Sequence, residues 1–248
     1  MCADDALVEL DLTDVTSAGY YTYDDPVVAD AHAALTAAFP ANAPTIVLTE
    51  GSVDRRALKG ALEHLHPHLA DLYAFMDFEG MSVPRGAGYL AATVKAFAGA
   101  GVANRIIALF DADTGARGAL RALAGLRLPP NIQVLTYPPT TLGQSYPTVG
   151  PSGAHDVNVN GTAGSVELYF GEDVLRRADG TLTPVQWGGF DPEVGAYQGE
   201  LQDKAALQSR FWRKLATAGS ESADVGAFDW SGMRAILTLL HTAFSCGS

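Results

Sequence analysis

Two aspartates, Asp111 and Asp113, stand one residue apart directly after the apolar run Ile106–Phe110. Carboxylates at this spacing repel each other, and the repulsion raises their pKa values unless a cation or a hydrogen-bond network compensates it. From the pair alone, three interpretations stay open: a metal ion, a hydrogen-bonded helix cap, or a solvated turn. The elements around the pair decide what can lie beside it.

Short apolar runs bounded by turn-forming residues alternate with segments of helical periodicity in the first half of the chain. We expect strands within 44–52, 72–78, 105–111 and 131–137, and helices at 52–65, 89–101 and 114–126. This alternation predicts βαβ units, and therefore an α/β fold with a parallel sheet of about four strands and helices on both faces. Ligands bind such sheets beyond the carboxyl ends of the strands. Four acidic residues fall at those ends: Glu50, Asp77, Asp111 and Asp113.

The remaining segments give the expected domain organisation. Residues 1–43 are an N-terminal extension with a helix in the alanine-rich stretch 27–39, and residues 44–138 are the α/β core. Residues 139–163, rich in Pro, Gly, Ser, Thr and Asn, are expected to be a loop or linker. Residues 164–248 are expected to be a mixed α+β extension. Its last helix carries an apolar stripe that we interpret as core packing: Trp230, Met233, Leu237, Leu240 and Phe244.

Composition and charge exclude several classes of protein. The net charge of −12 argues against non-specific coating of nucleic acid, but not against a local contact at an acidic, cation-binding centre. No apolar run reaches the roughly 18 residues of a membrane-spanning helix, and the acidic N-terminus is unlike a signal peptide. Cys2 and Cys246 fit neither a zinc site nor a disulfide framework. We therefore expect a cytoplasmic protein without membrane attachment.

Two motifs lie at strand-to-helix junctions: "TEGSVD" at Thr49–Asp54 and "DADTGARG" at Asp111–Gly118. With them the chain resembles the Toprim domain, which topoisomerases, primases and the overcoming-lysogenization-defect (OLD) type nucleases share. Residues 45 to about 137 match the whole βαβαβαβ order of that domain. Residues 164–215 further resemble bacterial stand-alone HEPN/Toprim-type proteins. No accessory domain of a gyrase, topoisomerase or primase is recognisable, so those activities are not expected.

The resemblance implies a Toprim-like, Rossmann-like catalytic core at 44–138, completed by residues of the C-terminal extension. It implies a phosphodiester hydrolase, a DNA or RNA endonuclease that depends on Mg²⁺ or Mn²⁺. Such hard cations prefer carboxylate oxygens as ligands. The catalytic residues would be Glu50, Asp111, Asp113 and Lys204, the last by stabilising phosphate charge. The metal ligands would be Glu50, Asp54, Asp111, Asp113 and Glu167.

Three basic residues indicate where a substrate would bind, and the resemblance indicates the partners. Arg55, Arg56 and Lys59 lie near the expected active face and are candidates for binding nucleic acid. The resemblance also implies a setting in bacterial defence, with an ATPase or a HEPN-type partner. The apolar C-terminal helix could pack against a second copy of the chain, so the sequence is also compatible with a homo-oligomer.

Each site residue also has a purely structural interpretation. Asp54 would favour the positive end of a helix dipole, and Asp113 would be a helix N-cap. Lys204 would be a solvated lysine at the start of a helix, paired with Glu200 at i,i+4, and Glu167 would be an ordinary exposed strand or helix residue. The three basic residues 55, 56 and 59 would form a solvated helix face. We expect no metal site at His64, His66 and His68, because alternate positions diverge on a helix.

Two alternatives concern the whole chain. One is a non-catalytic Toprim-like subunit that binds a nucleotide or a partner, which the acidic charge favours. The other is a haloacid-dehalogenase-like phosphatase, in which the first aspartate of an Asp-x-Asp motif is phosphorylated. That motif normally lies on the first strand, whereas Asp111 and Asp113 follow the third expected strand. Thr114 and Gly115 also stand in reversed order, so we rank this alternative lower.

Overall fold

The computed structural model describes residues 11–27, 30, 43–77, 85–192, 194–219 and 228–245. The chain divides into two compact units, Met1–Asn42 and Ala43–Ser248. The first unit contains the short helix α1 (Thr13–Ser17), whereas nearly all of the helix expected at 27–39 lies outside the described residues. The second unit contains every candidate site residue.

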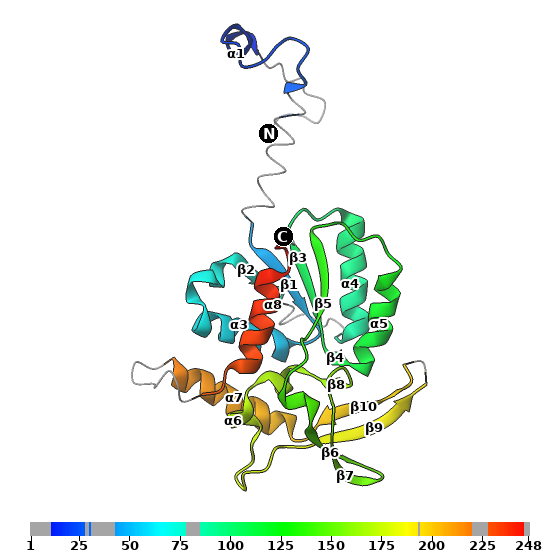
Figure 1. Ribbon diagram of the computed structural model, residues 1–248. Helices are drawn as coiled ribbons and strands as arrows, with labels where there is room; N and C mark the ends of the chain where they lie inside the picture. Colours follow the sequence, from blue (N-terminus) through cyan, green and yellow to red (C-terminus); the bar gives the residue numbers. More distant parts are fainter. Residues whose placement is uncertain are drawn as a thin grey trace. The chain divides into compact units, whose positions relative to one another are not determined.

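The centre of the second unit is a four-stranded, fully parallel sheet (Figure 1). In spatial order its strands are β2 (Tyr73–Phe75), β1 (Thr45–Thr49), β3 (Ile106–Phe110) and β5 (Ile132–Thr136). The connecting helices are α3 (Ser52–Leu65), η1 (Pro67–Leu72), α4 (Ala87–Ala100) and α5 (Thr114–Ala124). These elements confirm the expected α/β fold with its parallel sheet.

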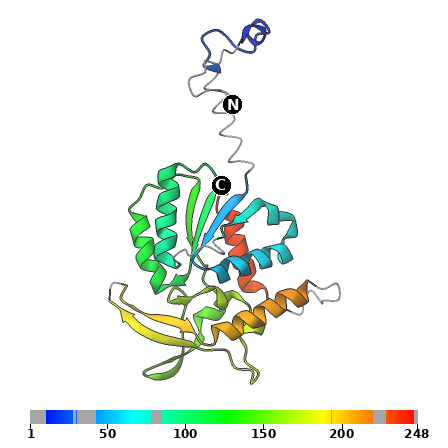
Figure 2. The same ribbon diagram turned by 180° about the vertical axis from the view of Figure 1, so that it is seen from behind.

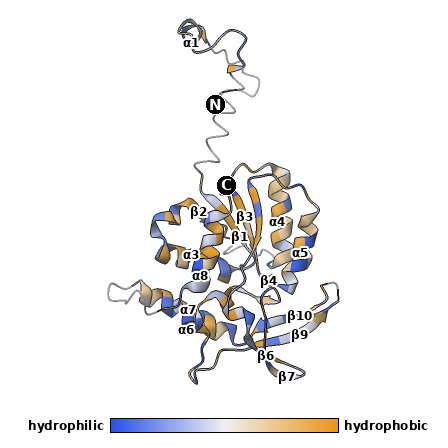
Figure 3. Ribbon diagram, in the orientation of Figure 1, coloured by the Kyte–Doolittle hydropathy of each residue, from blue (hydrophilic) through white to orange (hydrophobic). Residues whose placement is uncertain are grey.

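Helices cover both faces of this sheet, as Figure 2 shows from behind. On β3 all five side chains are buried, and they alternate between two cores. Ile106, Ala108 and Phe110 pack towards α4 and α5, whereas Ile107 and Leu109 pack towards α3. Figure 3 shows the hydrophobic colouring of these central strands. A strand buried on both faces reads as a continuous apolar run, which is why the sequence reveals it.

Residues 139–163, expected to be a loop or linker, instead hold regular structure. They include η2 (Leu142–Gln144), β6 (Tyr146–Gly150) and β7 (Gly153–Val157). β6 and β7 form a second sheet with β9 (Val185–Asp191) and β10 (Ala196–Leu201), in the order β10-β9-β6-β7. The buried Tyr146 anchors β6, because its hydroxyl donates to the carbonyl of Thr183 at 2.9 Å. Turn-forming residues at both ends of these short strands hide them from pattern analysis.

The second sheet lies beyond the carboxyl ends of the parallel sheet (Figure 1). A two-stranded ladder of β4 (Ala112–Asp113) and β8 (Ala163–Gly164) connects the two. The remaining elements are η3 (Val166–Tyr169), α6 (Glu172–Leu175), α7 (Lys204–Ala218) and α8 (Ser231–Thr242). The C-terminal part thus covers the edge where a ligand of the parallel sheet is expected.

The apolar stripe of the C-terminal helix is core, as expected. Trp230, Met233, Leu237 and Leu240 are buried in the cluster that also contains the inner face of α3, and Phe244 packs against it. Among the described residues, no helix combines the length and the apolar character that crossing a bilayer requires.

Candidate metal centre

Glu50 and Asp111 meet because the neighbouring parallel strands β1 and β3 end side by side. The backbone N–H of Asp111 donates to Oε1 of Glu50 at 2.9 Å, and the first residue of α4, Ala87, supplies a second backbone hydrogen bond. Burial nevertheless raises the pKa of Glu50 to about 7, and the charges of Asp113 and Asp54 add to the increase. Glu50 is therefore close to half-protonated at neutral pH.

Asp111 lies at the centre of the acidic residues. Burial raises its pKa well above the usual value, and four other carboxylates raise it further. These are the other four predicted metal ligands: Asp54, Glu50, Asp113 and Glu167. Oδ1 of Asp111 is buried and has no hydrogen-bond partner. A buried oxygen without a partner is costly, and a cation is the kind of ligand that would compensate it.

Asp54 faces this cluster from the first turn of α3 and is only 8% exposed. The buried hydroxyl of Tyr137 donates to its Oδ1 at 2.7 Å. Burial raises the pKa of Asp54, and the charge of Glu167 raises it further, while hydrogen bonds from Tyr137 and with the Asp111 side chain act in the opposite direction. The helix-dipole interpretation alone does not explain a carboxylate buried among other carboxylates. Asp54 is part of the cluster.

Asp113 is the N-cap of α5, as its structural interpretation predicted: its Oδ1 accepts a hydrogen bond from the N–H of Ala116 at 2.8 Å. Its Oδ2 accepts one from Nε2 of Gln198, on β10, at 2.8 Å. Each oxygen has a further lone pair. Capping and metal ligation are therefore compatible at this residue.

Glu167 comes from the C-terminal part, on η3, and is only 4% exposed. The interpretation of Glu167 as an ordinary exposed residue is therefore wrong. Its Oε1 accepts a hydrogen bond from Nε2 of Gln208, on α7, at 2.8 Å. The fold thus brings Glu167, which is distant in sequence from both motifs, into the same cluster as Asp54 and Asp111.

Lys204 begins α7 beside the cluster. Its Nζ lies 3.1 Å from Oε1 of Glu200, which confirms the predicted i,i+4 pair. Burial lowers its pKa, but the carboxylates of Glu167, Glu200 and Asp111 outweigh burial, and the net shift is upward. Lys204 is therefore positively charged at neutral pH and within electrostatic reach of Asp111.

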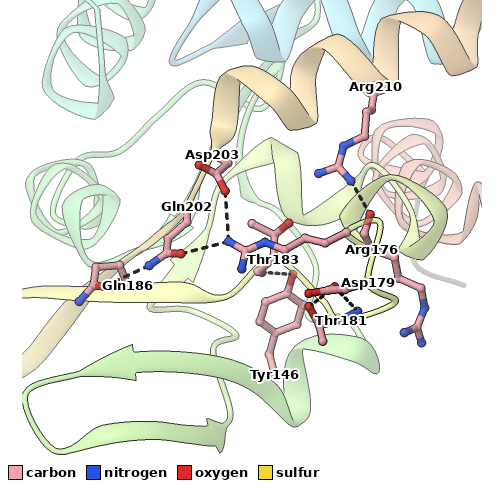
Figure 4. A network of polar contacts seen from close by, with 10 residues as sticks. Tyr146, Arg176, Asp179, Thr181, Thr183, Gln186, Gln202, Asp203 and Arg210 are labelled. Atoms are coloured by element: carbon pink, nitrogen blue, oxygen red, sulfur yellow. Dashed lines mark hydrogen bonds and ion pairs between the residues drawn. The ribbon is translucent and has the colours of Figure 1, made fainter.

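A polar network holds Gln202 and Asp203, the two residues directly before the start of α7 (Figure 4). Arg177 donates from Nη2 to Oδ2 of Asp203 at 3.1 Å and to Oε1 of Gln202 at 3.2 Å. Among the described residues, Asp203 is the one non-glycine residue with a positive φ, 52°. A left-handed residue of this kind persists where its surroundings hold it in place. The network therefore positions the lysine next to the acidic edge.

The three predicted substrate-binding residues lie apart from the carboxylates, along the exposed side of α3. Arg55 pairs with Asp77, so Asp77 is engaged there, and Lys59 lies 3.8 Å from Glu63. Arg56 stacks over the ring of Trp212, on α7, at 4.5 Å. These residues line a hollow of about 780 Å³ between α3 and α7. Gln208, which holds Glu167, lines the same hollow, so it leads towards the cluster.

Three residues of the site were missed by sequence reasoning: Tyr137, Gln198 and Gln208. Each donates to one carboxylate of the cluster. Tyr137 directly follows β5, so the strand-end rule that selects Glu50 and Asp111 also applies to it. No sequence signal distinguishes the two glutamines from other polar residues of β10 and α7.

The site fits a hard divalent cation in donor chemistry, because its side chains offer carboxylate oxygens. Within the described part of the chain, however, no three His, Cys, Asp or Glu side chains are already arranged to hold one ion. Mutual repulsion of carboxylates opposes such convergence until a cation compensates it. Comparisons of this chain with protein-family models, with curated proteins and with solved structures give no match.

Proposed function

We propose that this protein is a divalent-cation-dependent phosphodiester hydrolase, a DNA or RNA endonuclease of the Toprim type. The order of β1, α3, β2, α4, β3, α5 and β5 agrees with the order that the resemblance implies. The observation that carries the proposal is the position of Asp111, whose buried Oδ1 has no partner and whose carboxylate lies within reach of four others.

The cation would be held by Asp111 with Glu50, Asp54, Asp113 and Glu167. When bound, Mg²⁺ or Mn²⁺ neutralises phosphate charge and lowers the pKa of a water nucleophile. Glu50, whose pKa is about 7 in the metal-free protein, would act either as a ligand of this cation or as the general acid or base. Lys204 presents a positive charge for the phosphate in the transition state.

The hollow along α3 supports a nucleic-acid substrate. Arg55, Arg56 and Lys59 supply positive charge, and Trp212 supplies an aromatic ring beside Arg56. Both kinds of group contact nucleic-acid backbones and bases. Because the whole chain has a net charge of −12, contact with nucleic acid would be confined to this local group of basic side chains. Participation in bacterial defence, with an ATPase or HEPN-type partner, rests on the resemblance alone.

The two alternatives account for less of the site. A haloacid-dehalogenase-like phosphatase would use Asp111 and Asp113, but it gives no role to Glu50, Asp54 and Glu167 in the same cluster. A non-catalytic subunit is favoured by one observation: Arg55, Arg56 and Lys59 each already contact another side chain. That subunit would have no use for a buried, unpartnered carboxylate oxygen.

The test is cleavage of supercoiled plasmid, linear duplex DNA and single-stranded RNA in EDTA, Mg²⁺ or Mn²⁺, with a small phosphate monoester as an additional substrate. Wild type is compared with Asp111→Asn and Glu50→Gln, and Asp156→Asn on the exposed strand β7 is the matched control. Mn²⁺ binding is measured on the same four proteins. We expect cation-dependent cleavage in wild type and Asp156→Asn, and loss of both cleavage and Mn²⁺ binding in Asp111→Asn.

The outcomes separate the alternatives. Mn²⁺ binding without cleavage of any substrate would favour the non-catalytic subunit. Hydrolysis of a small phosphate monoester, lost in Asp111→Asn but kept in Glu50→Gln, would favour the phosphatase. Neither binding nor cleavage would mean that Asp111 and Asp113 serve the fold alone.

A further inference from the structure

Four of the six histidines gather at the opposite end of α3 from the carboxylates: His64, His66, His68 and His241. The expectation that His64, His66 and His68 diverge assumed a continuous helix. α3 ends at Leu65, and the 3₁₀ helix η1 starts at Pro67, so the chain turns between them. The turn places His66 and His68 side by side, and α8 adds His241.

The ring of His66 contacts the rings of His68 and His241, each in an edge-to-face arrangement. The ring centroids of His66 and His241 are 5.3 Å apart, and those of His66 and His68 are 6.1 Å apart. Both pairs are close to perpendicular, with interplanar angles of 84° and 81°. Two imidazoles that bind one tetrahedral ion at a metal–nitrogen distance of about 2.1 Å have ring centroids roughly 5 Å apart. The first pair has this spacing, and the exposed His68 has room to rotate towards it.

His241 offers a free ring nitrogen. Its Nδ1 lies 2.9 Å from the hydroxyl of Tyr73, whereas its Nε2 is buried and has no hydrogen-bond partner. Burial lowers the pKa of His241, and the charges of His66 and His68 lower it further. A neutral imidazole with one nitrogen hydrogen-bonded and the other open is the usual form of a metal ligand.

We propose that His66, His68 and His241 form a second cation site, specific for transition metals of the Zn²⁺ class. Three imidazole nitrogens suit such borderline ions, whereas Mg²⁺ and Mn²⁺ prefer carboxylate oxygens. Like the carboxylates, these side chains are not yet converged on one point, and binding draws His68 inwards. The ion joins α8 to the segment between α3 and β2, elements far apart in the sequence. Its binding therefore stabilises the docking of the C-terminal helix.

The experiment is a titration with Co²⁺, whose visible absorption reports tetrahedral nitrogen coordination, followed by displacement with Zn²⁺. Excess Mg²⁺ is present throughout to occupy oxygen sites. The proteins are wild type, His68→Gln, His241→Gln and, as matched control, His155→Gln on the exposed strand β7. We expect wild type and His155→Gln to bind equally, and the other two variants to bind at least tenfold more weakly. His68 is exposed, so its variant tests the site even if His241→Gln folds poorly.

The same titration of Asp111→Asn separates this site from the carboxylate cluster. We expect unchanged Co²⁺ absorption in that variant, whatever its nuclease activity. Equal Co²⁺ affinity in wild type and His68→Gln, or an octahedral spectrum in wild type, would overturn the proposal. Loss of the absorption in Asp111→Asn would also overturn it, because the ion would then belong to the carboxylates.

Discussion

The two ends of α3 carry two clusters of ionisable side chains with a common plan. At its start lie the carboxylates around Asp111, and after its end lie the histidines around His241, about 21 Å away for a 14-residue helix. Each cluster contains one buried atom without a partner, Oδ1 of Asp111 or Nε2 of His241. Each also contains a tyrosine hydroxyl bonded to one member, Tyr137 to Asp54 and Tyr73 to His241.

The clusters differ in what burial does to their charge. Burial disfavours the charged form at both ends, so it raises the pKa of Glu50 and Asp111 but lowers the pKa of His241. The acidic end is therefore destabilised as the pH rises, and the histidine end as the pH falls below about 6.5. Burial therefore favours the neutral imidazole that a metal ion needs at the histidine end, whereas at the acidic end the carboxyls would have to lose protons for a cation to bind.

The largest expected effect comes from Asp111→Asn, which changes only the carboxylate cluster. Asp111→Asn removes the central carboxylate, and we expect cation-dependent cleavage to fall roughly a thousandfold, because metal activation contributes several kcal/mol. In EDTA the same variant should melt at a higher temperature than wild type, since repulsion from four carboxylates is relieved. Cleavage rates and thermal melts in EDTA check both. A variant that loses activity and also stability in EDTA would contradict the repulsion argument.

The next effect is the pH dependence of stability in EDTA. Glu50 has a pKa of about 7 in the folded protein against 4.5 in the unfolded chain, so the folded state binds the extra proton between these values. Its contribution to the free energy of unfolding therefore falls as the pH rises from 4.5 to 7, by up to about 3 kcal/mol. Urea denaturation across this range measures the slope.

Two controls sharpen the pH experiment. Glu50→Gln should reduce the slope, because the titrating group is gone. Saturating Mn²⁺ should also reduce it, because a bound cation stabilises the ionised carboxylates of the folded state. An equal slope in wild type and Glu50→Gln would assign the effect to another group.

Local sequence signals predict the parallel sheet and the acidic residues at its edge. The elements that the sequence does not predict depend on long-range packing. β3 reads as a buried strand from five consecutive apolar residues, and parallel strands necessarily bring Glu50 and Asp111 to one edge. By contrast, β6 and β7 were hidden by turn-forming residues, and they form a sheet with strands far along the chain. Their order depends on pairing, which a local pattern does not encode.

The same distinction between local sequence signals and long-range contacts applies to the residues of the site. Asp54, Asp111 and Asp113 lie within motifs, whereas Gln198 and Gln208 act through contacts with residues 85 and 41 positions away. The expectation that His64, His66 and His68 diverge extends helical periodicity past the end of α3 at Leu65, so it does not anticipate the ring contact between His66 and His68. The contact between His66 and His241, 175 positions apart in the sequence, is of the long-range kind that local reasoning lacks.

Tyr137→Phe removes the hydroxyl at the acidic end while keeping the ring. Asp54, buried in the carboxylate cluster, loses the hydroxyl that donates to its Oδ1 at 2.7 Å and lowers its pKa in wild type. We expect the free energy of unfolding to fall by about 1–2 kcal/mol and Mn²⁺ to bind roughly tenfold more weakly. Urea denaturation and Mn²⁺ titration provide the two numbers. Unchanged Mn²⁺ affinity would remove Asp54 from the set of ligands.

Tyr73→Phe is the matched change at the histidine end, and its effect should be the smallest. The hydroxyl of Tyr73 contacts Nδ1 of His241 at 2.9 Å, but both side chains are only partly buried, so water replaces the lost partner. We expect a loss of less than about 1 kcal/mol in the free energy of unfolding. Co²⁺ affinity should fall several-fold, because the hydroxyl orients the ring, while Mn²⁺ affinity stays at the wild-type value. A Co²⁺ affinity equal to wild type would mean that ring contacts with His66 and residue 73, rather than this hydrogen bond, orient His241.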